Sequence, residues 1–418
     1  MYLERIGEQR YQKVLNLLSS LSFEAMGYSS PNPPVACVLT DPDGKILSYG
    51  NTQQDGKDHA ERVAYKSLKG DWKNRHIVFV TLEPCSHTGR TPPCLDLVLE
   101  NEALALYYGV SDPNPEVRKR DGLQECSLKG IYTESLYEIR QIALAFLKGF
   151  LSRIETGKPY CFFKAAVSKE GYYVSLPKKQ EAISSPESFA LSSLLRSKVD
   201  AVLVGPGTVS CDIPGLNYRK PDFYEIDDVS PRFFREEHEP PTGHLQQNIF
   251  YRELLACLKN KDSRERREEE NYQPYRVFFL PKDSRCIEPL LNKQENINFL
   301  YSSKKAIFIL PKDSNISRTQ KERMQILSNF DLWEYSKDTL ENTIYELGIK
   351  LKWNTVLLEG GNFLYSLFAS CKGRGEFIQI QSQAKEIEQG LKPVIPFHGL
   401  VRKNTITLKQ DTWSIYTI

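Results

Sequence analysis

The chain has 418 residues, 40% of them hydrophobic, which is enough for more than one core, so two domains are expected. Lys and Arg number 55 and Asp and Glu 53, a balance that argues against a nucleic-acid-binding protein. Nine cysteines without a secretory signal favour thiols or metal ligands over a disulfide framework. No apolar run reaches the roughly 20 residues of a membrane helix, so we expect a soluble, cytoplasmic protein with no membrane partner.

The first 153 residues predict a three-layer α/β domain. Apolar residues recur at helical spacing across Tyr11–Met26. A hairpin follows, with strands at Val35–Leu39 and Ile46–Tyr49 around a turn that contains Pro42 and Gly44. The expected elements after it are a helix at about 59–68, a strand at 76–82, a helix after Pro93 and a strand at 104–110.

Residues 154–418 predict a second α/β domain. Its expected strands are 161–167, 201–204, 276–280, 306–310 and 355–358, with a helix at 191–198. The segment from about 220 to 275 is rich in charged residues and has few apolar ones. We expect a solvated insertion there, with one helix at about 248–258.

A zinc-site pattern lies in the first domain. His59 stands where a helix begins, Cys85 closes a strand and Cys94 precedes the next helix. One imidazole and two thiolates suit tetrahedral Zn²⁺ with a fourth position open to water, as in catalytic sites. Glu61 can face the same pocket without ligating, take a proton from water, deliver it to a ring nitrogen and help ammonia leave. The pattern therefore predicts a zinc-dependent nucleobase-type deaminase.

Other interpretations of these residues stay open. Asp58 and Glu61 could form a capping box, and His87 could complete a closed, structural zinc site. The domain could also be a zinc-stabilised binding module without turnover. A nucleic-acid deaminase is a further alternative, although the balanced charge counts against it.

The motifs resemble those of the bifunctional riboflavin-biosynthesis deaminase/reductase family. They are residues 30–33, 59–61, 81–94 and 112–115, and the eight residues between the two cysteines are the specific mark. The resemblance implies a cytidine-deaminase-like fold and deamination of 2,5-diamino-6-ribosylamino-4(3H)-pyrimidinone 5′-phosphate. It implies that four residues hold this substrate: Asn32, Arg90, Asp112 and Asn114. The last two could equally form only a turn.

The resemblance continues into the second half. It implies a dihydrofolate-reductase-like domain that reduces the ribosyl group to ribityl with NADPH. Its motifs are residues 164–171, 183–185, 195–196, 207–209, 212–219 and 359–361. The implied substrate contacts are Lys164, Arg196, Leu216, Arg219 and Glu359. The implied cofactor contacts are Ala166, Thr208, Asp212 and Gly361. A guanidinium pairs well with phosphate, which makes Arg196 and Arg219 candidates for the substrate phosphate, although either could equally form a surface ion pair.

The chain also departs from the family pattern. Thr52 replaces a His and Ala36 a Gly in the first half. In the second half the departures are Glu170 for Asp, Ala182 for Trp, Phe189 for Arg, Ser193 for His, Gly375 for Asp and the segment 381–386. The alternative function is therefore a deaminase whose second domain is a degenerate reductase that serves as a structural or partner-binding module. A homo-oligomer is a further expectation.

Overall fold

A computed structural model of the chain describes residues 2–89, 92–114, 120–177, 181–219, 244–259, 272–300, 306–328, 332–367, 371, 373–394 and 400–418. These residues form two compact units. The first unit ends at Gly157 and also holds helix α9 (His244–Lys259) as far as Glu253, and the second unit holds the rest. The expected boundary at residue 153 lies inside helix α6 (Tyr137–Thr156), which Gly157 ends with a left-handed φ of 72°.

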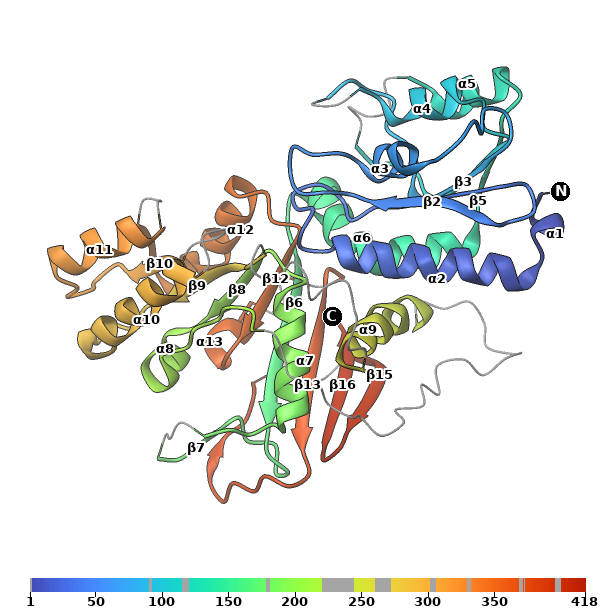
Figure 1. Ribbon diagram of the computed structural model, residues 1–418. Helices are drawn as coiled ribbons and strands as arrows, with labels where there is room; N and C mark the ends of the chain where they lie inside the picture. Colours follow the sequence, from blue (N-terminus) through green and yellow to red (C-terminus); the bar gives the residue numbers. More distant parts are fainter. Residues whose placement is uncertain are drawn as a thin grey trace. The chain divides into compact units, whose positions relative to one another are not determined.

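The first unit is built on a five-stranded sheet of order β2-β1-β3-β4-β5 (Figure 1). Its strands are β1 (Ala36–Thr40), β2 (Ile46–Asn51), β3 (Ile77–Leu82), β4 (Ala105–Val110) and β5 (Tyr132–Ser135). β1 pairs antiparallel with β2 and β3, and the remaining pairs are parallel. Its other helices are α1 (Tyr2–Ile6), α2 (Glu8–Ala25), α3 (Ala60–Ser67), α4 (Cys94–Glu100) and α5 (Gly122–Leu128).

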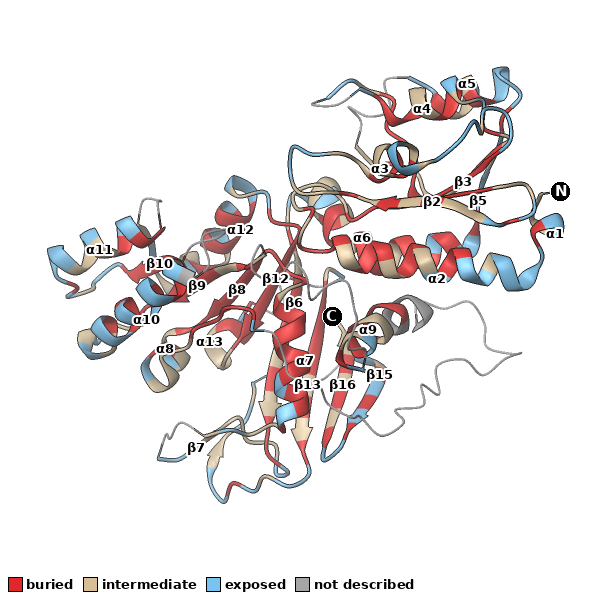
Figure 2. Cartoon of the chain, viewed as in Figure 1, coloured by how far each residue is buried: buried red, intermediate tan, exposed pale blue. Residues whose placement is uncertain are grey.

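Two helix layers enclose this sheet. α2 and α6 cover one face, and α3, α4 and α5 lie on the other (Figure 1). Every residue of β1 and β3 is buried as a result (Figure 2). Central strands covered on both faces are continuous apolar runs, which is why their sequences predicted them. The expected three-layer α/β domain is confirmed.

The second unit has a nine-stranded sheet of order β11-β10-β9-β8-β12-β6-β13-β16-β15. All pairs from β11 to β13 are parallel, and β16 and β15 extend the sheet antiparallel. The strands are β6 (Tyr160–Val167), β8 (Ala201–Val204), β9 (Tyr275–Phe279), β10 (Ala306–Pro311), β11 (Trp333–Tyr335), β12 (Thr355–Glu359), β13 (Gly375–Ser382), β15 (Val401–Leu408) and β16 (Asp411–Thr417). A separate antiparallel pair joins β7 (Val174–Ser175) to β14 (Gly390–Leu391).

The remaining helices of this unit connect the strands. They are α7 (Pro186–Arg196), α8 (Pro206–Asp212), α10 (Ile287–Leu300), α11 (Arg318–Ser328), α12 (Leu340–Lys350) and α13 (Asn362–Tyr365), with 3-10 turns at Ser284–Cys286 and Lys337–Thr339. In the register of the sheet, Glu359 at the end of β12 lies opposite Lys164 of β6 and Val204 of β8. The carboxyl ends of neighbouring parallel strands therefore meet at one edge, where α/β sheets bind ligands.

The expectation of a fully solvated insertion at 220–275 is wrong for helix α9. Phe250, Tyr251 and Leu254 are completely buried. The Phe250 ring packs against Phe23 of α2 at 5.9 Å and Phe146 of α6 at 6.5 Å between centroids. These aromatic side chains bury a large apolar area, which outweighs the polar composition of the segment. Residues 272–275 are also described, and Gln273 is buried, whereas 220–243 and 260–271 lie outside the described residues.

No helix in the described part of the chain is both long and apolar enough to cross a membrane.

Candidate functional site

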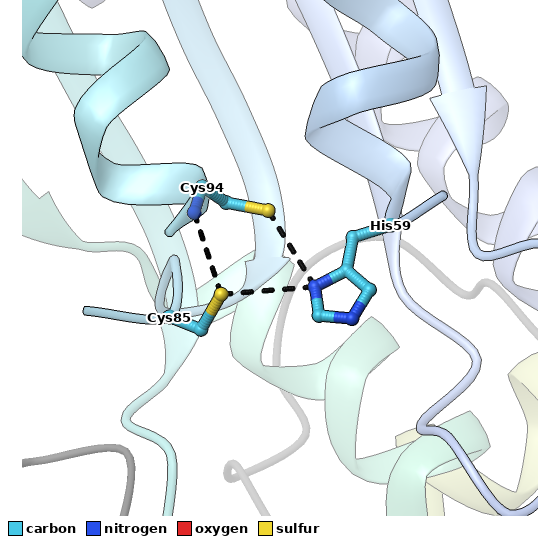
Figure 3. A group of neighbouring side chains, drawn as sticks. All are labelled: His59, Cys85 and Cys94. Atoms are coloured by element: carbon cyan, nitrogen blue, oxygen red, sulfur yellow. Dashed lines mark hydrogen bonds between the residues drawn. The ribbon is translucent and has the colours of Figure 1, made fainter. Parts of the chain in front are cut away.

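Three side chains from separate segments of the first unit converge at one point. His59 is the N-cap residue of α3, Cys85 follows β3, and Cys94 opens α4. Their ligand atoms all lie within 4.8 Å of one another (Figure 3), and no other group of this kind occurs among the described residues. The predicted metal ligands are thus brought together from positions up to 35 residues apart along the chain.

The spacing of these atoms fits a single zinc ion. The Nδ1 atom of His59 lies 3.5 Å from the Cys94 sulfur and 3.7 Å from the Cys85 sulfur. Tetrahedral zinc, with bonds of about 2.05 Å to nitrogen and about 2.3 Å to sulfur, separates two such ligands by about 3.6 Å. The backbone N–H of Cys94 donates to the Cys85 sulfur at 3.4 Å, which supports a thiolate there. The donor set and its geometry therefore fit zinc.

The electrostatics of the two cysteines agree with a ligand pair. Hydrogen bonds from Cys94 and the proximity of His59 lower the pKa of Cys85 to about 4, although burial opposes them. The same hydrogen bond and burial raise the pKa of the Cys94 thiol. One thiolate is thus favoured before any metal binds, and a cation at this point would favour the second.

Glu61 is buried beside the cluster. It lies in the first turn of α3 with 4% of its surface exposed. Burial and the charge of Cys85 raise its pKa to about 7, and His59 opposes them. The capping-box interpretation is wrong, because His59 occupies the N-cap position without a side-chain cap, while Asp58 pairs with Lys66 at 2.5 Å. Glu61 can therefore act as an acid or base near neutral pH.

The structure describes three of the four expected deaminase substrate residues. Asp112 follows β4, and burial raises its pKa to about 6, while the Asn114 N–H donates to it at 2.9 Å and opposes that shift. The charge of Cys85 also acts on Asp112, so it lies in the field of the cluster. Asn32 is half-buried in the loop before β1. Arg90 lies outside the described residues, and His87 does not join the metal-ligand group.

Thr52, which stands where the family pattern has a His, forms hydrogen bonds with the backbone of Val35. Its hydroxyl accepts a hydrogen bond from the Val35 N–H at 3.2 Å, and its own N–H donates to the Val35 carbonyl at 3.0 Å. Ala36 donates its N–H to the Thr81 hydroxyl at 3.0 Å. The Thr52 side chain thus helps to hold the start of β1 next to the site, whereas the Ala36 bond uses only its backbone, so nothing in the structure explains the Ala36 departure.

A second candidate site is a cavity of about 430 Å³ in the second unit. It lies where β6, β8 and β12 end, and α8 borders it. The expected ligand residues that line it are Lys164, Ala166, Thr208, Asp212, Glu359 and Gly361. The other three, Arg196, Leu216 and Arg219, are not among its lining residues. Four aromatic residues also line the cavity: Tyr173 before β7, Phe189 of α7, and Phe363 and Tyr365 of α13. Only Phe189 was marked beforehand, by its departure from the family pattern, and the other three belong to none of the motifs.

A buried ion network crosses the floor of this cavity. The Nε and Nη2 atoms of Arg196 donate to both carboxylate oxygens of Glu359 at 2.7 and 2.8 Å, and the Lys164 amino group lies 3.4 Å from one of them. Burial alone would raise the pKa of Glu359, but Arg196 and Lys164 lower it to about 2. Burial lowers the pKa of Lys164, and Glu359 opposes that shift. Glu359 is therefore an anion held in a fixed orientation.

Two consecutive glycines let the backbone approach neighbouring side chains closely. Gly360 has a φ of 130°, and a Cβ there would lie 2.7 Å from the Thr208 hydroxyl. A Cβ at Gly361 would lie 2.7 Å from the Tyr173 hydroxyl. Larger residues would displace Thr208 and Tyr173 and change the cavity, which explains why the Glu-Gly-Gly segment is needed here.

Several residues that depart from the family pattern in the second unit form hydrogen bonds or ion pairs there. Glu170 accepts hydrogen bonds from the Ser168 hydroxyl at 2.8 Å and the Ile387 N–H at 3.0 Å, as an Asp carboxylate could. Lys385, in the atypical segment 381–386, pairs at 2.6 Å with Glu181, which lines the cavity. The Ser193 hydroxyl donates to the Arg219 carbonyl at 2.6 Å. An intact cavity thus remains despite the changes.

Comparison with known proteins supports the first unit directly. Residues 9–110 match the family described as the cytidine and deoxycytidylate deaminase zinc-binding region. The riboflavin biosynthesis protein RibD of Mycobacterium tuberculosis is 35% identical over 210 residues, and that of Escherichia coli 33%. Each alignment covers 50% of this chain, but only 61% and 55% of the relatives' own lengths, so the chain is matched over less than two thirds of each.

Solved structures extend the comparison over the whole chain at the level of the fold. The diaminohydroxyphosphoribosylaminopyrimidine deaminase/5-amino-6-(5-phosphoribosylamino)uracil reductase of Thermotoga maritima has a TM-score of 0.69 at 20% identity, covering 98% of this chain and 99% of its own. A RibD structure from Acinetobacter baumannii has a TM-score of 0.68 at 21% identity, with the same coverage.

The family match and the metal cluster agree in making the first unit similar to zinc-binding deaminase domains of the cytidine and deoxycytidylate deaminase type, and the chain as a whole has the two-domain α/β fold of the Thermotoga maritima structure. The predicted fold class is therefore confirmed. Over half of its length the chain is similar to the riboflavin biosynthesis proteins RibD, which agrees with the resemblance that its motifs indicate.

Proposed function

We propose that the chain carries out two consecutive steps of riboflavin biosynthesis. The first is hydrolytic deamination of 2,5-diamino-6-ribosylamino-4(3H)-pyrimidinone 5′-phosphate, and the second is reduction of the ribosyl side chain to ribityl with NADPH. The observation that carries the proposal is the His59, Cys85 and Cys94 cluster with a buried Glu61 beside it. The name of the Thermotoga maritima structure, a diaminohydroxyphosphoribosylaminopyrimidine deaminase and 5-amino-6-(5-phosphoribosylamino)uracil reductase, supports the choice of substrates.

In the deamination, His59, Cys85 and Cys94 would hold zinc, which supplies a Lewis acid that activates water. Glu61 would accept the proton that water loses and pass it to the pyrimidine ring and the departing ammonia. Burial raises its pKa to about 7 without a metal, and a cation at the cluster would lower that pKa, which favours the carboxylate form that accepts the proton. Asp112 and Asn114 would hold the pyrimidine edge, together with Asn32 and Arg90.

In the reduction, the cavity of the second unit would hold the substrate and NADPH. Thr208, Asp212, Ala166 and Gly361 line the part that we assign to the cofactor. Lys164 and Glu359 form the polar end of the same cavity and would orient the ribosyl group. Leu216 keeps the role that the family resemblance implies, as a contact of the substrate.

The second candidate function is deamination alone, with the second unit as a structural or partner-binding module. The substitutions at 182, 189 and 193 favour it. The Lys164–Glu359 pair and the open cavity count against it, because a disused site has no need of a buried ion network. We therefore favour the bifunctional enzyme.

The test is to incubate the purified, zinc-loaded protein with the diaminopyrimidine phosphate, with and without NADPH, and to identify products by mass. Deamination without NADPH and a further gain of two hydrogens with NADPH are expected. Deamination that stops at the uracil product would support the single-function alternative, and an unchanged substrate would contradict both. A cytoplasmic location, homo-oligomerisation and the absence of a nucleic-acid partner stay predictions.

A further inference from the structure

Two buried cysteines of the second unit lie in contact with each other. Cys161 belongs to β6, and Cys371 lies shortly before β13, 210 residues further along the chain. Their sulfur atoms are 3.4 Å apart, and both residues are free thiols that are buried in the hydrophobic core of this unit. Neither residue belongs to the metal cluster or to the lining of the cavity.

The backbone of the sheet fixes the distance between these two cysteines. In the parallel pairing of β6 with β13, which lie side by side in Figure 1, Cys161 is opposite Gly375. The Cys161 N–H donates to the Arg374 carbonyl at 3.0 Å, and the Arg374 N–H donates to the Cys371 carbonyl at 2.8 Å. The contact between the sulfurs therefore follows from the sheet itself and is not the result of one side-chain rotamer.

Hydrogen bonds stabilise the pair in its reduced form. The Cys371 thiol donates to the Cys161 sulfur, and the Cys161 thiol donates to the Pro159 carbonyl at 3.8 Å. The Tyr345 hydroxyl lies 3.7 Å from the Cys371 sulfur. The hydrogen bond with Cys371 and burial raise the pKa of the Cys161 thiol, so the protonated form is favoured. Under reducing conditions the pair therefore rests as two thiols.

The same arrangement is close to that of a disulfide. A disulfide bond holds its sulfurs at about 2.05 Å, so the two atoms need to approach by only about 1.3 Å. Gly373, two residues after Cys371, is exposed, so a small oxidant reaches this part of the chain from solvent. A bond across 210 residues closes a long loop, and long loops lose the most conformational entropy in the unfolded chain.

A bond at this point would also fasten one wall of the cavity. The chain that follows β12 already contacts β6 at two points: the Lys164 amino group lies 3.4 Å from Glu359, and the Tyr365 hydroxyl donates to the Lys164 carbonyl at 3.0 Å. Lys164, Glu359 and Tyr365 all line the cavity. A bond from Cys161 to Cys371 would add a covalent third link between the same two segments.

We propose that Cys161 and Cys371 form a reversible redox switch, which hydrogen peroxide converts from a dithiol into a disulfide that stabilises the second unit. One sulfur attacks the peroxide and becomes a sulfenic acid, with release of one water. The second sulfur then displaces the hydroxyl group as another water when the S–S bond forms. The two thiols together lose two electrons and two protons, and the peroxide takes up both. Because the partner sulfur is so close, it traps the sulfenic acid before irreversible oxidation to the sulfinic acid.

The chemical test treats the full-length, zinc-loaded protein with hydrogen peroxide, so that Cys85 and Cys94 are occupied by the metal. After removal of the peroxide, free thiols are alkylated in denaturant, and the digested protein is analysed by mass spectrometry. We expect two peptides joined through Cys161 and Cys371, two hydrogens lighter than the separate thiol peptides, which dithiothreitol separates. Recovery of both residues as free thiols after half-buried Cys286 has been oxidised, or as separate sulfinic acids, would overturn the switch.

A stability measurement tests the consequence of the bond. Tryptophan fluorescence follows the second unit, which holds three of the four tryptophans of the chain: Trp333, Trp353 and Trp413. The urea midpoint of the peroxide-treated wild type should exceed that of the reduced protein by about 1 M.

Matched variants assign this shift to the cysteine pair. In Cys161→Ala and in Cys371→Ala, the treated and reduced proteins should unfold at the same urea concentration, even if alanine lowers both midpoints. Cys286→Ala, in a 3-10 turn of the same unit, should keep the wild-type difference. Equal midpoints for the treated and reduced wild type, or an undiminished shift in both pair variants, would refute the switch. Neither measurement uses a substrate, so the result does not depend on the proposed function.

Discussion

At the level of single residues, the deaminase proposal depends on a carboxylate that burial keeps near its point of titration. Glu61 lies next to the thiolate of Cys85, which raises its pKa, and next to His59, which lowers it. A metal at the cluster would add a positive charge and so lower the pKa of Glu61 from its raised value. The residue would then be anionic when water binds and protonated after the transfer, as the chemistry requires.

Glu61→Gln should abolish this transfer while leaving the metal ligands intact. We expect deamination to fall by about a hundredfold to ten-thousandfold, the usual contribution of a general acid–base group. Zinc content, measured by elemental analysis, should stay at one per chain. Glu100→Gln, at an exposed position on α4, should behave like wild type. A Glu61→Gln protein that holds zinc and deaminates normally would rule out the proton shuttle.

At the level of secondary-structure elements, the position of α3 is set by its contact with β2. A Cβ at Gly50 would lie 2.6 Å from the Ala60 carbonyl and from Cβ of Val63, and 2.7 Å from the Ala64 nitrogen. Backbone atoms cannot move aside as a flexible side chain can. The strand therefore approaches the helix as closely as it does only because residue 50 lacks a side chain.

Gly50→Ala should consequently push α3 away from the sheet. We expect a loss of about 1–3 kcal/mol in the free energy of unfolding, typical of overpacking, and weaker zinc binding because α3 carries His59 and Glu61. Urea unfolding and a competitive zinc titration measure the two effects. Ser48→Ala on the same strand should leave both nearly unchanged, since its buried hydroxyl has no hydrogen-bond partner among the described residues. Equal stability of the Gly50→Ala and Ser48→Ala proteins would contradict this account.

A buried histidine links α3 to the segment before β3. His76 is fully buried, its Nδ1–H donates to the Trp72 carbonyl at 2.8 Å, and Nε2 accepts from the Tyr65 hydroxyl at 2.8 Å. A carbonyl can only accept, so Nδ1 carries a proton; burial disfavours the doubly protonated ring, and in the neutral ring Nε2 accepts from the Tyr65 hydroxyl. Burial lowers the pKa of His76, and the bond to Trp72 opposes this.

The first unit should therefore lose stability in mild acid. Because the folded pKa lies below the unfolded value of about 6.5, the unfolded chain takes up the proton first, and the free energy of unfolding falls as the pH drops below about 6.5. The slope from this residue is at most about 1.4 kcal/mol per pH unit. Urea unfolding of zinc-loaded protein between pH 7.5 and 5 should show a shallower decline for His76→Gln. Parallel declines in the two proteins would exclude His76 as the source.

The same elements show what the sequence could and could not predict. Strands buried on both faces, such as β3 and β8, are uninterrupted apolar runs and were predicted almost to the residue. β15 alternates buried and exposed residues at the sheet edge, with polar residues on its outer face, and was missed. Helix α9 was expected to be solvated because the charged residues around it hide a few apolar side chains that are fully buried.

The two candidate sites also differed in how much of each could be predicted from the sequence. The metal ligands were predictable because local motifs at a helix start and a strand end place them together without knowledge of the wider fold. The close approach of Tyr173 to Gly361 could not be predicted, because the two residues lie far apart along the chain and Tyr173 belongs to no motif. Only the sheet order, which carries β12 between β6 and β8, brings such segments to one cavity.

At the level of the whole molecule, each unit has its own sheet and its own hydrophobic core. The core of the first unit gathers residues such as Val78, Val80 and Leu106, and that of the second Phe163, Leu203 and Leu358. The metal cluster and Glu61 belong wholly to the first unit, and the residues that line the cavity belong wholly to the second. The two reactions should therefore be separable by mutation, with the deaminated product released by one site serving as the substrate of the other.

This separation can be measured with two single variants of the full-length chain. Glu61→Gln should not deaminate the diaminopyrimidine phosphate but should reduce 5-amino-6-(5-phosphoribosylamino)uracil with NADPH at the wild-type rate. Glu359→Gln weakens the anchor of Lys164 and Arg196, so it should deaminate normally and lose at least about tenfold in reduction. Mixing the two variants should restore the complete conversion, because the intermediate can diffuse between molecules. If Glu61→Gln also lost reduction, or if the mixture accumulated the uracil intermediate, the sites would not be independent, and the two units would have to act as one catalytic assembly.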